Sequence, residues 1–106
     1  MKFLVTTTRR QTAPMPPQAI AEILTAQRGW FDEHLADGTY DCAYAYAYGG
    51  GGVAIVNAKT TEELNHILAG SPLFPIADFD VVALTDVKIA LENSARAIER
   101  SATIHA

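Results

Sequence analysis

The stretch YDCAYAYAYGGGG, residues 40–52, constrains the fold more than any other part of this 106-residue chain. Tyrosine occupies every second position from Tyr44 to Tyr48, and four glycines follow directly. Side chains alternate between the two faces of a strand, so the tyrosines are expected on one face, together with Tyr40 and Cys42, and the alanines on the other. We therefore expect two different surfaces to pack against the two faces.

The alanine face allows a helix of the same chain to approach closely, which leaves the tyrosines to face a second subunit. The alternation is also consistent with tyrosines that lie under the helices and line a pocket, and the pattern does not decide between the two. The glycines separate two apolar runs and predict a hairpin turn, with a flexible flap over a pocket mouth as the alternative. They do not form a phosphate-binding loop, because they lie between two strands and lack the lysine of that motif.

Hydrophobic patterning and turn residues predict seven elements. In order, they are a strand at 2–8, a helix at 16–36, strands at 40–48 and 53–58, a helix at 59–70, a strand at 76–85 and a helix at 86–100. This order is that of a ferredoxin-like βαββαβ domain, in which two helices cover one face of a four-stranded antiparallel sheet. The open face needs a partner. The sequence thus predicts an α+β domain at 1–85 that forms a homodimer or higher homo-oligomer through its sheet, and a C-terminal helix and tail at 86–106.

Composition limits the classes of function. Apolar residues make up 49% of the chain and charged residues 19%, with a formal charge of −4, which is typical of one globular domain. The eight basic residues are scattered, which argues against nucleic-acid binding. There is no apolar run of about 20 residues and no signal peptide, so we expect a cytoplasmic protein without membrane contact. Cys42 is the only cysteine, no cluster has metal-ligand spacing, and no cofactor is indicated.

Three residues of the first predicted helix, Gln27, Phe31 and His34, lie three and four positions apart and share a face. His34 is a candidate general acid or base, because the histidine pKa lies near physiological pH. Gln27 would then orient a substrate carbonyl, with Phe31 against the substrate. The alternative is that Gln27 and His34 satisfy buried backbone groups or lie at the rim of a subunit interface.

The strands carry further candidates for substrate binding. Arg9 and Arg10 end the first strand and can hold a carboxylate, although paired arginines there are often solvated. Asp78 and Asp80 share one face of the last strand and form either an acid–base pair or a solvated edge. The candidates for substrate contact are Phe31, Tyr44, Tyr46, Arg9 and Asp78.

Part of the chain resembles the muconolactone isomerase family, a group of small oligomeric enzymes of the dimeric α+β barrel type. The stretches that carry the likeness are SPLFPIADFDV (71–81), DGTY (37–40) and EELNHIL (62–68). The resemblance runs from Met1 to about Leu84 and implies the barrel fold and the movement of a proton around a lactone ring that bears a carboxylate. It also implies an acidic side chain on the first helix as the proton shuttle, and the matching position here is Gln27.

Two hypotheses for function follow. One is an isomerase-like protein that acts on a small lactone or cyclic carboxylated metabolite by acid–base proton transfer, with the carboxylate of the family replaced by Gln27. The other is a non-catalytic ligand-binding or assembly module built on the same oligomeric barrel.

Overall fold

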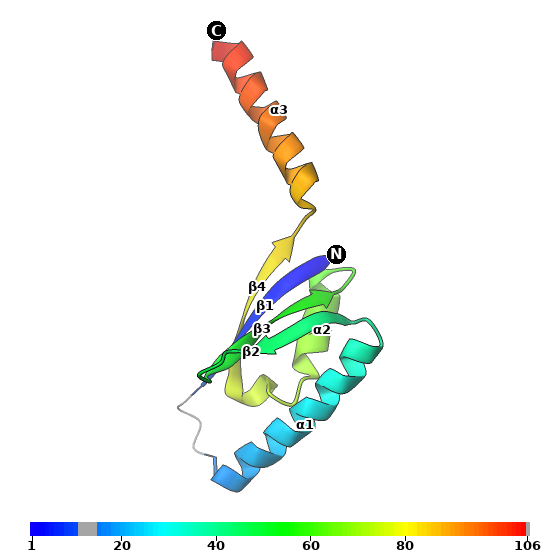
Figure 1. The fold of residues 1–106 in the computed structure, drawn as a ribbon, viewed down its shortest axis with the longest axis vertical. Helices are drawn as coiled ribbons and strands as arrows, with labels where there is room; N and C mark the ends of the chain where they lie inside the picture. Colours follow the sequence, from blue (N-terminus) through cyan, green and yellow to red (C-terminus); the bar gives the residue numbers. More distant parts are fainter. Residues whose placement is uncertain (11–14, 106) are drawn as a thin grey trace.

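The computed structural model describes residues 1–10 and 15–105. In chain order, the elements are β1 (Lys2–Arg9), α1 (Pro17–Ala36), β2 (Tyr40–Ala45), β3 (Gly51–Asn57), α2 (Thr61–Ala69), the 3-10 helix η1 (Phe74–Ile76), β4 (Ala77–Leu84) and α3 (Val87–His105). The sheet has the order β2-β3-β1-β4 with antiparallel neighbours throughout (Figure 1). The predicted α+β arrangement is confirmed, and the last helix runs five residues beyond its predicted end.

The core lies between one face of the sheet and the helices α1 and α2, and we call this side the covered face. Phe3 and Val5 of β1 alternate with outward-facing residues, and Val56 of β3 joins them with no exposed surface. Leu64 and Leu68 lie one turn apart on α2 and pack against these strands. Full burial of a side chain of this size contributes about 1.5–3 kcal/mol, so this layer holds the helices to the sheet.

A β-bulge at Asp41 interrupts the predicted alternation of β2. Tyr40 and Cys42 pair with two successive residues of β3, so Asp41 is an extra residue on its strand. The bulge exchanges the two faces: Tyr40 is 4% exposed in the core, whereas Tyr44 is 70% exposed on the opposite face. The prediction that Tyr40 shares a face with Cys42 and Tyr44 is therefore wrong, because it assumed a regular ladder.

The strand β2 is also shorter than predicted. It ends at Ala45, and Tyr46 and Tyr48 lie in the turn that follows. The Tyr46 N–H donates to the carbonyl of Gly51 at 2.8 Å, which closes the hairpin to β3. Tyr44 is thus the only member of the run Tyr44, Tyr46 and Tyr48 that belongs to a strand.

Two of the four glycines are required by close contacts between backbones. A Cβ on Gly51 would lie 1.9 Å from the carbonyl oxygen of Thr7, and one on Gly52 would lie 2.3 Å from that of Tyr44. No side chain fits at either distance, so glycine lets β3 run this close to both of its neighbours. The predicted hairpin is confirmed.

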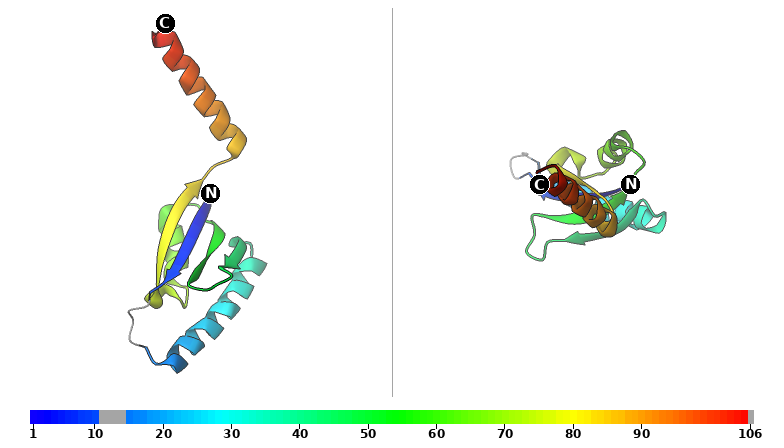
Figure 2. Two further views of the ribbon diagram at one scale, coloured as in Figure 1. Left: turned by 60° about the vertical axis from the view of Figure 1, so that its left-hand side comes forward. Right: turned by 90° about the horizontal axis from the view of Figure 1, so that it is seen from above.

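No helix of the described residues packs over the second face of the sheet, which we call the open face. Its apolar side chains come from all four strands and are Leu4, Cys42, Tyr44, Val53, Ile55, Val82 and Leu84. Beyond the sheet, α3 extends away from the body (Figures 1 and 2), and the molecule measures 66 × 31 × 27 Å. Its radius of gyration is 18.4 Å, whereas about 13 Å is expected for a compact chain of this length. Across the described residues, no helix has the length and apolar character to cross a membrane.

Candidate functional site

A cavity of about 520 Å³ lies between α1 and the covered face of the sheet. It exists because α1 packs on the core through Trp30 and Phe31, while its N-terminal half extends past the sheet (Figure 1). The walls are largely apolar, with Leu24 and Phe31 from α1, Leu73 from the connector before η1 and Phe79 from β4. Both the volume and the apolar lining are typical of small-molecule sites.

Gln27 supplies the buried polar group of this cavity. Its side chain is 6% exposed, and its Oε1 accepts hydrogen bonds from Ser71 Oγ at 2.8 Å and from the Leu73 N–H at 3.2 Å. The Ser71 hydroxyl also accepts from the Leu73 N–H at 3.3 Å, so the three groups form one small network. The network ties the middle of α1 to the connector between α2 and η1.

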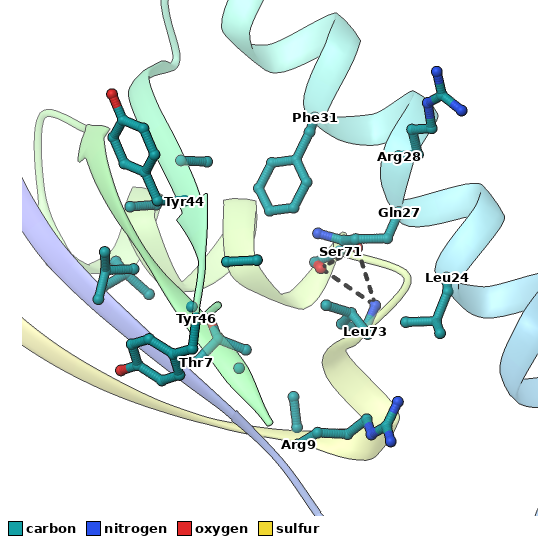
Figure 3. Close-up of a pocket in the computed structure, with 18 of the residues that line it drawn as sticks. Thr7, Arg9, Leu24, Gln27, Arg28, Phe31, Tyr44, Tyr46, Ser71 and Leu73 are labelled. Atoms are coloured by element: carbon teal, nitrogen blue, oxygen red, sulfur yellow. Dashed lines mark hydrogen bonds between the residues drawn. The ribbon is translucent and has the colours of Figure 1, made fainter. Parts of the chain in front are cut away.

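These contacts fix the orientation of the Gln27 amide. A backbone N–H can only donate, so the amide atom that faces Leu73 must be the oxygen. The nitrogen, Nε2, makes no hydrogen bond with any described residue and points into the cavity below Phe31 (Figure 3). A fixed amide with two N–H donors therefore faces an apolar space.

Tyr40 is the buried tyrosine of the cavity wall. Its ring meets those of Trp30 and Phe31 edge to face, with centroids 5.1 and 5.6 Å away. Burial raises the pKa of the Tyr40 hydroxyl above its ordinary value, so this group stays protonated at neutral pH. The wall thus has a neutral phenol beside Phe31.

His34 lies at the end of the same aromatic cluster, and it is not among the residues that line the cavity. Its ring stacks on Trp30 with centroids 4.0 Å apart, and its Nδ1 lies 2.8 Å from the Trp30 carbonyl oxygen. Because a carbonyl only accepts, Nδ1 carries a proton in this contact. Of the three predicted helix residues, the structure brings Gln27 and Phe31 together at the cavity.

The strand candidates are divided between the cavity and the surface. Arg9, Tyr44 and Tyr46 contribute to the lining, although both tyrosine hydroxyls point away from Gln27 (Figure 3). Asp78 lies outside the lining, where its carboxylate accepts from Arg10 Nε at 2.8 Å. Arg9 forms no ion pair with any described residue, so its guanidinium is available at the cavity.

Sequence reasoning missed two residues that hold Gln27, namely Ser71 and Leu73. Both lie in the proline-rich stretch SPLFP, and nothing local in that stretch indicates a contact with α1. Arg28 and Asp32 of α1 also line the cavity and were not predicted. Across residues 1–10 and 15–105, no three histidine, cysteine or acidic side chains are grouped to hold a metal ion.

A four-stranded antiparallel sheet, two helices on one face and a largely apolar cavity beneath the first helix define a small ferredoxin-like α+β protein. A sequence model of the muconolactone delta-isomerase family matches residues 1–88. The chain therefore belongs to this family. No curated protein sequence matches the chain.

Solved structures agree with this assignment at the level of the fold. A crystal structure of muconolactone isomerase superposes with a TM-score of 0.73 at 22% identity, covering 81% of this chain and 90% of that one. The 5-chloro-2-hydroxyhydroquinone dehydrochlorinase from Burkholderia phenoliruptrix AC1100, solved in complex with 2,5-dihydroxybenzoquinone, superposes with a TM-score of 0.63 at 15% identity. That match covers 83% of this chain and 97% of the dehydrochlorinase.

Proposed function

We propose that the cavity between α1 and the sheet binds a compact cyclic metabolite that carries a ring carbonyl and a carboxylate. Gln27 donates to the carbonyl oxygen, the apolar walls around Phe31 hold the ring, and Arg9 binds the carboxylate. The family to which the chain belongs supports a lactone as the ring compound.

The observation that carries this proposal is the amide nitrogen of Gln27. Gln27 is 6% exposed as a residue, yet its amide nitrogen is not a buried unpaired atom, because it reaches the open part of the cavity. A ligand carbonyl placed there pairs with the N–H donors, whereas a ligand without an acceptor would bury them unpaired at about 1–3 kcal/mol. The site therefore selects for a carbonyl at this depth.

Gln27 can polarise a ligand carbonyl, which is one part of an isomerisation, but it cannot carry the proton, which is the other part. A carbonyl that accepts from an amide is polarised, which acidifies the adjoining C–H bond. The amide does not take up and return a proton near neutral pH, as a carboxylate raised in pKa by burial does. Among the described residues that line the cavity, the one carboxylate is that of Asp32, which is exposed, and there is no histidine, glutamate or cysteine, which favours ligand binding with little turnover.

The open face of the sheet supports a second part of the proposal, a homo-oligomer. Leu4, Ile55 and Val82 lie side by side in the register of three strands, with Cys42 next to Ile55. A continuous apolar surface of this kind marks a contact between protein chains. Copies of the chain associate through this face, as a dimeric α+β barrel requires.

Calorimetric titration with muconolactone, combined with a turnover assay, tests the site. We expect saturable binding by the parent chain and turnover well below the ordinary enzyme range of roughly 1–1000 per second. Gln27→Leu keeps the volume but removes both donors, so affinity should fall at least tenfold. Gln27→Glu restores an acidic group at this position and should raise turnover above that of the parent.

His34→Gln is the matched control on the same helix, because His34 lies outside the cavity lining. It should leave affinity and turnover unchanged. Ordinary turnover by the parent that disappears in the His34 variant would assign the proton transfer to His34. Absence of muconolactone binding, with the fold intact, would contradict the proposed ligand class.

A further inference from the structure

One polar side chain interrupts the apolar row that β1 presents to the helices. Phe3 and Val5 of this row are 1% and 2% exposed in the core, and Thr7 is the next residue on the same face. Thr7 lines the cavity, as Val5 does. Because side chains alternate along a strand, Thr6 and Thr8 point to the open face. Of the three successive threonines in β1, the middle one is therefore the one that reaches the site.

The surroundings of Thr7 leave its hydroxyl accessible from the cavity. Thr7 pairs with Gly52 of β3 and with Phe79 of β4, neither of which has a side chain that can form a hydrogen bond. The hydroxyl has no hydrogen-bond partner among the described residues, yet it is not a buried unpaired atom. It therefore has room to bind a ligand atom from the strand side of the cavity, across from Gln27 on α1 (Figure 3).

Arg9 follows Thr7 on the same face of β1 and also lines the cavity. Alternate residues of a strand are about 6.5 Å apart, a separation that the long arginine side chain spans. The Arg9 guanidinium forms no ion pair with any described residue. A carboxylate takes two parallel hydrogen bonds from a guanidinium and keeps lone pairs for a further donor. One ligand carboxylate can therefore accept from both Arg9 and Thr7.

The charged side chains of the cavity favour an anionic ligand. Among the described lining residues these are Arg9, Arg28 and Asp32, with a net charge of +1, whereas the whole chain carries −4. A cleft of one sign with low-dielectric walls raises the local concentration of ions of the opposite sign. Arg28 and Asp32 both lie on α1 and cancel in charge, so the excess positive charge is on the β1 side, at Arg9.

We propose that Thr7 is a specificity-determining residue of the cavity, and that its hydroxyl donates to the same carboxylate that Arg9 binds. This inference rests on the proposed function and narrows its ligand class. The carbonyl of the ligand meets Gln27 on the α1 side, so its carboxylate must stand on the other side of the ring, toward β1. A ligand that covers Thr7 without accepting from it buries an unpaired hydroxyl, which lowers its affinity.

Calorimetric titration with muconolactone and with its methyl ester tests the role of Thr7. Thr7→Val keeps the branched shape and removes the hydroxyl, so the affinity for muconolactone should fall about tenfold, as expected when a hydrogen bond to a charged group is lost. The affinity for the methyl ester, which has no carboxylate, should fall less. Equal losses for the acid and the ester would contradict a contact with the carboxylate.

Two further single variants control for changes in the strand itself. Thr7→Ser restores a hydroxyl at the same position and should bind muconolactone as the parent does. Thr8→Val makes the matched change on the open face of the same strand and should also bind as the parent does. Loss of affinity in Thr8→Val equal to that in Thr7→Val would show that β1 as a whole, and not the cavity hydroxyl, is responsible.

A double-mutant cycle with Arg9 shows whether the two donors share one group. If both contact one carboxylate, Thr7→Val should weaken binding much less in the Arg9→Met background than in the parent. Losses that simply multiply would place the two side chains on different ligand groups and overturn the inference. Parental affinity in Thr7→Val would overturn it too and leave the proposed function intact. A folded parent that binds neither compound would refute the proposed function, and this inference with it.

Discussion

The covered and open faces of the sheet are built from adjacent residues of the same strands, yet they differ in what completes them. Phe3 and Val56 are at most 1% exposed under the helices, while their neighbours Leu4 and Ile55 remain partly exposed on the other side. The chain completes the covered face by itself and places its cavity there. The described residues leave the open face uncovered, so one side of the sheet carries the cavity and the other offers the surface that we propose for assembly.

The strand β2 shows how sharply the two faces are separated. Before the bulge, Tyr40 belongs to the aromatic cluster of the core, and three residues after it Tyr44 stands on the open face. The same residue type therefore has two roles on one short strand. Replacing each tyrosine in turn compares the two faces directly.

The largest expected effect comes from Tyr40→Ala. Removing a ring that is 4% exposed leaves a cavity under Trp30 and Phe31, so unfolding free energy should fall by about 3–5 kcal/mol. Tyr44→Ala removes a ring that is 70% exposed and should cost less than about 1 kcal/mol at concentrations where the chain is dissociated. Urea unfolding of both variants measures the difference, and equal losses would contradict the assignment of faces.

Gly52→Ala tests the backbone contact beside the cavity, and we expect it to lower the free energy of unfolding by less than Tyr40→Ala does. The new methyl group would lie 2.3 Å from the Tyr44 carbonyl oxygen, so β2 and β3 must separate, at about 2–3 kcal/mol. Gly49→Ala is the control, because a methyl group at Gly49 would meet no atom within 4 Å. Its only cost is the positive φ of 86°, which should lower the free energy of unfolding by about 1 kcal/mol. Thermal unfolding ranks the two, and the reverse order would show that the turn conformation, rather than the close contact, requires the glycines.

On the open face, Ile55→Ser should change assembly more than folding. Ile55 is partly exposed between Leu4 and Cys42, so the variant should lose less than about 1.5 kcal/mol of unfolding free energy in the dissociated chain. The mass from light scattering should drop at concentrations where the parent is assembled. Parental mass would remove the open face from the interface.

The smallest effect concerns the bulge itself and depends on pH. Lys2 Nζ and Asn57 Nδ2 both donate to the Asp41 carboxylate and hold its pKa below the ordinary value. Because the folded-state pKa is the lower one, this contribution is complete above the unfolded value of about 3.9 and is lost as pH falls through the folded value. Asp41→Asn should therefore unfold at a lower temperature than the parent at pH 6, with the gap closing by pH 2.

An unchanged gap in melting temperature between the parent and Asp41→Asn at pH 6 and pH 2 would show that the ionised carboxylate does not hold the bulge. Asp41 is exposed, so water and salt screen its contacts and the gap should be small throughout.

The order of the elements was predictable because the signals for it are local. Thr60 caps α2 by accepting from the Glu63 N–H, and Gly38 takes a positive φ of 83° after α1, as their residue types indicate. The bulge was not predictable, because the contacts of Asp41 come from Lys2 and Asn57 on two other strands. The alternation of tyrosine and alanine along the strand's own sequence does not indicate where an extra residue interrupts the pairing.

The candidate site was predictable only in part, for the same reason. Gln27 and Phe31 were found because helical spacing places them on one face. Ser71 lies 44 positions from Gln27, and nothing local signals that its hydroxyl fixes the amide. The sequence therefore pointed to Gln27 but not to the direction of its donors.

The side-chain amide of Gln27 itself reports whether its N–H donors meet the ligand. In a ¹⁵N-edited NMR titration of the full chain with muconolactone, both Nε2 proton resonances of Gln27 should shift and saturate together with the calorimetric binding curve. They are identified by their disappearance in Gln27→Leu. Saturable binding of the lactone that leaves these two resonances unmoved would contradict the claim that Gln27 holds the ligand carbonyl.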